Sequence, residues 1–69
     1  MKIGERILYV LEKKNIKLSE FASIIDVREH NIEDWKYGNY NPTVAQIIRI
    51  SDYLNVSTDY LLKGEKRRQ

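Results

Sequence analysis

Hydrophobic positions near the start of the chain recur every three to four residues, as they do along one face of a helix. Ile3, Ile7, Val10 and Leu11 form this stripe, and charged residues such as Arg6 occupy the other faces. The pattern therefore predicts a first amphipathic helix whose apolar side packs inward.

A second stripe begins a few residues later. Leu18, Phe21, Ala22 and Ile25 are spaced i, i+3, i+4, i+7, which predicts a short second helix. Asp26 follows at once, and Asp is one of the few residues besides Gly that tolerate a left-handed backbone. We therefore expect a tight turn at Asp26.

Residues 28–36 are mostly polar and carry only a narrow apolar seam. Ile32 and Trp35 lie three residues apart, which predicts a third helix that buries these two side chains and exposes a wide polar face. We interpret both, like Phe21, as core residues. Gly38 can end this helix in a left-handed conformation and Pro42 cannot continue it, so a loop is predicted here.

Two more helices are predicted after this loop. Thr43 and Gln46 form a capping box at the start of a fourth helix. Ser57 is a side-chain cap for a short fifth helix, which Gly64 ends. The apolar positions of the fourth helix that we expect to face inward are Val44, Ile47, Ile48 and Leu54.

The composition excludes several classes of protein. A chain of 69 residues forms one domain, near the lower size at which a core alone stabilises a fold. Without cysteines and with His30 as its one histidine, it offers no disulfide and a poor metal site, so no cofactor is expected. The longest apolar run, residues 7–11, is far short of the ~20 residues that span a bilayer. Charged residues also interrupt any secretion signal, so no membrane association and a cytoplasmic location are expected.

The net charge of +2 is unevenly distributed. Four basic residues from Lys63 onward and the acidic Glu65 give +3, so residues 1–62 carry −1. We therefore divide the chain into a nearly neutral domain, residues 1–64, and a basic C-terminal tail, residues 65–69. A solvated tail is favoured over an arm that binds polyanions.

Two short helices joined by a tight turn form a helix-turn-helix. The segments FASIIDV, NIEDWKYGNYNP and LNVSTDYLL, within a match from about residue 3 to residue 64, resemble the phage repressor and Cro-type (XRE) helix-turn-helix family. The resemblance implies an all-α, lambda-repressor-like fold of five helices with a central helix-turn-helix. It also implies a transcription regulator, of phage, prophage or mobile-element type, that binds double-stranded DNA as a homodimer on an inverted repeat.

The resemblance assigns roles to individual positions. It places a dimer contact on the last helix, around Tyr60 and Leu61. The base-contacting positions would be Arg28, Glu29, His30 and Asp34, with Asn31 and Glu33 adjacent. The phosphate-contacting positions would be Lys17, Leu18, Tyr37, Asn39, Tyr40 and Asn41, with Lys36 and Arg28 as further cations.

Several positions depart from the family pattern. Leu11 and Lys36 stand where the family often has an Arg and a Glu that pair between the first and third helices, and since both differ, no lone charge is left behind. Leu18 stands where a Gln usually donates to a phosphate, so only its backbone N–H is available there. Asp26 replaces the usual turn Gly. Arg28 replaces the Ser or Thr that usually caps the third helix, and we therefore expect the start of this helix to lack a side-chain acceptor.

The acidic third helix leaves two functions open. The first is sequence-specific DNA binding, in which carboxylates face base edges and phosphates are held elsewhere. The alternative is a helix-turn-helix scaffold that binds a protein partner, as an adaptor or antitoxin-like module. A base contact and a solvated side chain are equally favoured for His30, and an exposed position is slightly favoured over an adenine contact for Asn31. The acids are not surrounded by apolar residues and do not form the acid and base pair that hydrolysis needs, so an enzyme is not expected.

Overall fold

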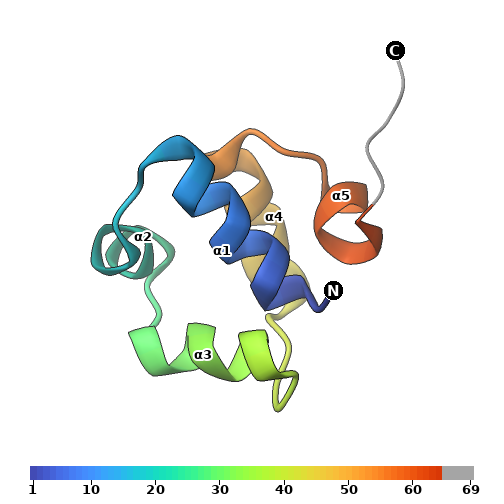
Figure 1. The fold of residues 1–69 in the computed structure, drawn as a ribbon, viewed down its shortest axis with the longest axis horizontal. Helices are drawn as coiled ribbons and strands as arrows, with labels where there is room; N and C mark the ends of the chain where they lie inside the picture. Colours follow the sequence, from blue (N-terminus) through green and yellow to red (C-terminus); the bar gives the residue numbers. More distant parts are fainter. Residues whose placement is uncertain (65–69) are drawn as a thin grey trace.

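The computed structural model describes residues 1–64, which form five α-helices and no strand (Figure 1). This confirms the predicted all-α fold. The predicted basic tail, residues 65–69, lies outside the described residues. None of the helices in the described part is long and apolar enough to cross a membrane. The helices are α1 (Ile3–Lys14), α2 (Leu18–Ile25), α3 (Glu29–Tyr37), α4 (Val44–Leu54) and α5 (Thr58–Lys63).

Each helix ends at a residue in the left-handed conformation. The predicted turn at Asp26 is confirmed, with φ of 65°, and the backbone N–H of Val27 then donates to the carbonyl of Ala22 at 2.9 Å. Gly38 ends α3 with φ of 81°, also as predicted. Such residues satisfy the last carbonyls of a helix and redirect the chain within one or two residues. Three of the four connections are three residues long, and the loop between α3 and α4, residues 38–43, is longer.

The predicted caps of α4 and α5 are both present. The backbone N–H of Gln46 donates to Thr43 Oγ1 at 3.1 Å, and the backbone N–H of Thr43 donates to Gln46 Oε1 at 2.8 Å. Ser57 Oγ accepts from the backbone N–H of Tyr60 at 2.9 Å. These bonds satisfy donors that a helix leaves unpaired in its first turn.

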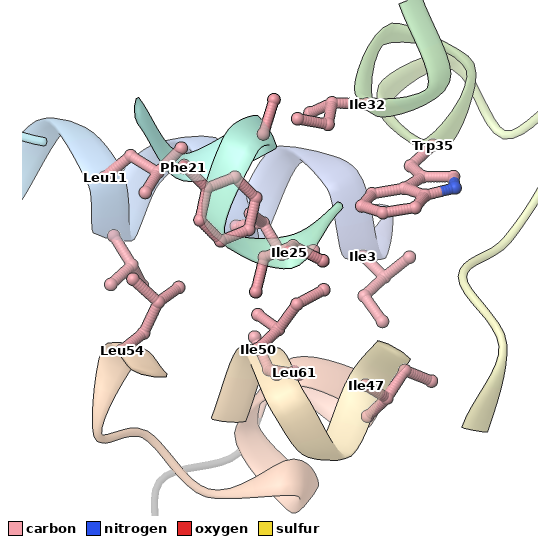
Figure 2. Packing of buried hydrophobic residues seen from close by; sticks show 13 residues of the cluster. Ile3, Leu11, Phe21, Ile25, Ile32, Trp35, Ile47, Ile50, Leu54 and Leu61 are labelled. Carbon is pink, nitrogen blue, oxygen red and sulfur yellow. The ribbon is translucent and has the colours of Figure 1, made fainter. Parts of the chain in front are cut away.

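One apolar cluster holds the five helices together (Figure 2). Phe21, Ile32 and Trp35 belong to it, which confirms their interpretation as core residues. Each helix contributes at least one buried side chain, and α1 contributes most. The buried apolar residues are Ile3, Ile7, Val10, Leu11, Phe21, Ala22, Ile25, Ile32, Trp35, Ile47, Ile50, Leu54 and Leu61.

The prediction for the inward face of α4 was wrong at two positions. Val44 is 74% exposed and Ile48 is 51% exposed, whereas Ile50 is fully buried. The buried residues Ile47, Ile50 and Leu54 follow one another at intervals of three and four. Ile48 lies one residue, about 100°, further round the helix. The chain therefore presents apolar side chains of α4 to solvent.

Helix α1 crosses α3 at very short range. A Cβ atom on the buried Gly4 would lie 2.2 Å from the backbone nitrogen of Lys36 and 2.3 Å from the carbonyl carbon of Trp35. No side chain fits there, because non-bonded carbon atoms approach to about 3.5 Å. Gly4 thus allows the backbones of α1 and α3 to touch, a role that the apolar periodicity did not indicate.

Arg6 is buried rather than solvent-facing, which corrects the sequence prediction. Its guanidinium donates to three carbonyl oxygens: Nε to Leu61 at 2.8 Å, Nη2 to Leu62 at 3.0 Å, and Nη1 to Met1. Cations are stabilised at helix C-termini because the last carbonyls have no intrahelical partner. Arg6 therefore fastens the end of α5 to α1.

Candidate nucleic-acid interface

Helix α3 lies along one edge of the molecule, at the bottom of Figure 1, with α1 above it in this view and α2 above its start. Its inner side is fixed by the buried side chains of Ile32 and Trp35 and by the close crossing at Gly4. Because one side of α3 is held this firmly, the opposite side is presented to the surroundings in a defined orientation.

The side of α3 opposite the core carries His30, Glu33, Asp34 and Tyr37 at i, i+3, i+4 and i+7. We call these four residues the outer stripe. His30, Glu33 and Tyr37 are exposed, and Asp34 is half-buried. Glu29, in the first turn, is exposed beside the stripe. The structure thus brings together on one surface most of the positions for which base contacts were predicted.

Asn31 has a structural partner that the sequence did not reveal. Its Oδ1 atom accepts from the backbone N–H of Arg28 at 3.0 Å. Arg28 itself supplies no side-chain acceptor to the first turn of α3, as expected from its sequence. Asn31, however, supplies the other half of a capping box, because it accepts from the N–H of the cap residue itself. The Nδ2 donor of Asn31 is not part of this bond.

A groove separates the start of α3 from the loop that precedes α4. Arg28 and Asn31 from the α3 side line it together with Tyr40 and Asn41 from the loop. Arg28 was predicted to contact bases, and Asn31 to lie beside the base-contacting positions. Tyr40 and Asn41 were predicted to contact phosphates, and all four residues border the same groove. Gln46, also at this groove, was identified from the sequence only as a capping residue.

The loop is tied to the end of α3 by its backbone. The carbonyl oxygen of Asp34 accepts from the N–H of Asn39 at 2.9 Å and faces the N–H of Tyr40 at 3.5 Å. Lys36 Nζ lies 5.4 Å from the ring centroid of the exposed Tyr37, a cation–π distance. A cation and an aromatic ring are therefore positioned together at the C-terminal end of α3.

The start of α2 provides a second group of predicted phosphate contacts. Lys17 is exposed immediately before the helix, whereas Leu18 is half-buried and packs against the core. The apolar side chain of Leu18 therefore contributes to packing, and its backbone N–H is among the donors that a helix leaves unpaired in its first turn. Ser19, exposed next to it, adds a hydroxyl donor that sequence reasoning did not single out.

The two residues predicted for a dimer contact on the last helix differ in their exposure. Leu61 is 0% exposed, so its side chain is used by the protomer's own core. Tyr60 is half-buried in a groove beside α1. The exposed apolar residue of α5 is Leu62, at 53%. Within residues 1–64, no three His, Asp or Glu side chains gather closely enough to hold a metal ion.

A tightly turned pair of helices, the second rigidly mounted with its polar side outward, defines a helix-turn-helix DNA-binding domain. Residues 4–67 match the family described as "Helix-turn-helix domain". The chain belongs to this family, and it is a domain of the phage repressor type.

The relatives agree with this assignment. The chain is 27% identical over 62 residues to the HTH-type transcriptional regulator ImmR of Bacillus subtilis (strain 168), covering 90% of this chain and 49% of the relative. It thus spans about half the length of this curated relative. The family and the fold are those of DNA-binding transcription regulators.

Solved structures show the same architecture. The P22 c2 repressor in complex with synthetic operator 9T is 29% identical, with a TM-score of 0.83 over 94% of this chain and 98% of that one. The solution structure of the DNA-binding domain of the P22 c2 repressor is 28% identical, with a TM-score of 0.82 over 100% and 91%. A transcriptional regulator from Listeria innocua, at 19% identity and a TM-score of 0.79, shares the fold.

Proposed function

We propose that the protein is a sequence-specific transcription regulator that inserts α3 into the major groove of an operator. The observation that carries this proposal is the likeness, over 94% of the chain, to a repressor in complex with its synthetic operator. The wide exposed side of α3 supports it, since the major groove admits one α-helix. Because the chain spans about half of the curated relative, the activity of a longer regulator is part of the proposal.

The acidic residues of α3 fit DNA binding if bases and phosphates are contacted by different groups. A carboxylate at Glu29 can accept from the N4 amino group of cytosine in the middle of the groove. We assign phosphates to the flanks of α3, where Arg28 and Lys36 place their cations, and to Lys17 with the first-turn N–H groups of α2. Tyr37 at the end of α3 and the loop residues Asn39, Tyr40 and Asn41 complete this set.

Asn31, His30 and Asp34 take different parts in this scheme. Asn31 uses Oδ1 to cap α3, so it offers DNA mainly its Nδ2 donor rather than a pair of bonds to adenine. His30 lies on the outer stripe in the first turn, where it can contact a base edge. Asp34, half-buried on the same stripe, lies one turn further along the helix. Base preference therefore depends most on the first turn of α3.

We further propose that two copies bind an inverted repeat through the exposed apolar side chains of α4 and α5. Val44 and Ile48 lie one turn apart on α4, and Leu62 shares a groove with Ile47. Leu62 replaces the buried Leu61 in this role. Exposed apolar residues that adjoin one another are typical of protein contact sites.

Selection of bound fragments from random duplex DNA tests the function. We expect enrichment of an inverted repeat with half-site centres about one helical turn, roughly 34 Å, apart. Leu62→Asp should abolish the preference for paired half-sites. The control is Ile24→Ser, which replaces an exposed apolar residue of α2 and should preserve self-association, as measured by sedimentation. Failure to enrich any sequence would contradict the proposed function.

The outer stripe favours one alternative function. It carries two carboxylates, Glu33 and Asp34, and no Lys or Arg, so a basic protein surface is a chemically suitable partner for α3. If the random selection enriches nothing while α3 binds a basic protein, the chain acts as a protein-binding module. Substitution of Glu33 by Lys would then weaken that complex.

A further inference from the structure

A second groove lies between α1 and α5, away from the proposed DNA-binding surface. Tyr9, Val10 and Lys13 line it from the second half of α1, and Val56 and Tyr60 line it from the α4–α5 connection and α5. In Figure 1 this half of α1 and the α4–α5 connection lie at the top, at the end of the molecule opposite α3. A ligand in this groove would therefore leave α3 accessible.

The groove combines an apolar base with a cationic rim. Val10 is buried and Val56 half-buried, so aliphatic side chains form the base. Tyr9 remains 45% exposed, which leaves one aromatic side chain open to solvent. Lys13 Nζ lies 5.4 Å from the ring centroid of Tyr9, and Lys14 lines the groove from the same helix turn. An occupant needs both an apolar group and negative charge to match these surfaces.

The apolar base and cationic rim of the groove disfavour three occupants: the end of this chain, a second copy of it, and DNA. The end of the chain, with Lys66, Arg67 and Arg68, has the same charge sign as the rim. A second copy related by a twofold axis would bring the two pairs of Lys13 and Lys14 ammonium groups together. A DNA duplex offers phosphates but no apolar side chain to cover Val10 and Val56.

We propose that the α1–α5 groove binds an acidic peptide segment of a partner protein, anchored by one apolar side chain. The apolar side chain lies between the rings of Tyr9 and Tyr60, over Val10 and Val56. Carboxylates on either side of it pair with Lys13 and Lys14. An extended or helical segment fits an open groove better than a small molecule, which needs a pocket that encloses most of its surface.

A peptide titration of the isotopically labelled protein, followed by backbone amide NMR, tests this proposal. The probe is a short blocked peptide with one apolar residue, of sequence Asp-Glu-Asp-Glu-Leu-Asp-Glu-Asp-Glu. We expect saturable shifts at the amides of Tyr9, Val10, Val56 and Tyr60, with a Kd on the order of 0.1–1 mM. A peptide with Asn and Gln in place of the acids should bind about fivefold more weakly, and a lysine-substituted one should not compete.

Two variants and one matched control locate the contact. Lys13→Glu reverses a rim charge and Tyr9→Ser removes an exposed ring, and each should weaken binding about fivefold or more. Both side chains are exposed, so the fold is retained. Arg49→Glu makes the same charge change on an exposed residue of α4 outside the groove and should leave the Kd unchanged.

The following outcomes of these experiments would contradict the proposal. Equal affinity for the neutral peptide would remove the electrostatic argument, and shifts confined to α3 would place the contact elsewhere. If diluting the free protein moves the groove amides, the occupant is a second copy. If random duplex DNA moves them, the occupant is nucleic acid. No saturable shift at any of these amides would mean that the groove takes no acidic segment.

Discussion

Helices α3 and α5 both pack against α1, but they are attached to it in different ways. Nine-residue α3 is held along its length by Ile32, Trp35 and a backbone crossing at Gly4. Six-residue α5 buries one side chain, Leu61, is capped at its start by Ser57, and is joined to α1 at its other end by the hydrogen bonds of Arg6. A helix this short is not stable alone, so polar anchors contribute a large share of its stability.

This difference in attachment bears on function, because it decides which exposed residues have no structural role and can contact other molecules. The outer stripe of α3 has no part in attaching the helix, so His30, Glu33 and Tyr37 can be selected for what they contact outside the protein. On α5 the carbonyls of Leu61 and Leu62 accept from Arg6, and Ser57 caps the first turn. Of these two helices, α3 therefore carries more exposed polar residues that packing does not require.

The strongest test of this contrast is Gly4→Ala. Alanine should gain about 1 kcal/mol of helix propensity. The added Cβ, however, meets the α3 backbone at 2.2 Å, and a backbone cannot move aside as a flexible side chain can. We expect a net loss of about 3 kcal/mol in the free energy of unfolding, measured by urea denaturation. Glu12→Ala, on an exposed position of α1, is the control and should be nearly neutral. Unchanged stability of Gly4→Ala would disprove the close crossing.

Arg6→Met tests the polar attachment of α5. Methionine retains most of the volume but leaves the carbonyls of Met1, Leu61 and Leu62 without their donor. We expect a loss of about 2 kcal/mol in unfolding free energy, because hydrogen bonds from a charged donor are lost at a buried site. Hydrogen exchange should become faster in α5 and change little in α3. Arg6→Lys should recover only part of the loss, since one ammonium group cannot reproduce the guanidinium's fork of donors. Equal acceleration in both helices would contradict a separate attachment.

Asn31 caps α3 and is also proposed to contact DNA, and two substitutions separate these roles. Asn31→Ala removes the acceptor for the Arg28 N–H and should cost about 1 kcal/mol of unfolding free energy, similar to Ser57→Ala at the start of α5. Asn31→Asp keeps an acceptor and places negative charge at a helix N-terminus, so it should preserve stability. It removes the Nδ2 donor, however, and should weaken operator binding. If Asn31→Asp binds the operator like the wild-type protein, Asn31 has only a capping role.

Most of the fold could be predicted from the sequence, because local signals agree with one another. The stripes of α1 and α2, the seam of Ile32 and Trp35, and the cap at Thr43 each indicate one helix or one boundary. The two polar or backbone contacts that join distant helices could not be predicted this way. Gly4 has no side chain, so it does not contribute to the apolar periodicity. Arg6 is charged, and charged residues normally lie on the surface. Its acceptors, the carbonyls of Leu61 and Leu62, belong to the backbone and carry no sequence signal.

The candidate interface was predictable to a different degree. The resemblance to the repressor family located α3 and its loop, and the structure places Arg28, Asn31, Tyr40 and Asn41 around one groove. The capping role of Asn31 was missed because the usual signal is a Ser or Thr at the position of Arg28. The inward face of α4 was misjudged at Val44 and Ile48, because four apolar residues within five positions fit more than one helical face.

Glu29→Gln should have the smallest effect on the fold and tests whether the acids of α3 serve selectivity. Glu29 is exposed in the first turn, so we expect a change in unfolding free energy within about 0.5 kcal/mol. A carboxylate near phosphates weakens binding to every duplex, and this loss is offset only where a cytosine amino group faces it. Glutamine should therefore strengthen binding to random duplex DNA roughly two- to fivefold and relax base preference at one position of each half-site.

Glu12→Gln, which makes the same change on an exposed position of α1, should alter neither property. Fluorescence anisotropy with selected and random duplexes at fixed salt measures both effects. Weaker binding to random DNA, or an unchanged base preference, would show that Glu29 does not face the bases.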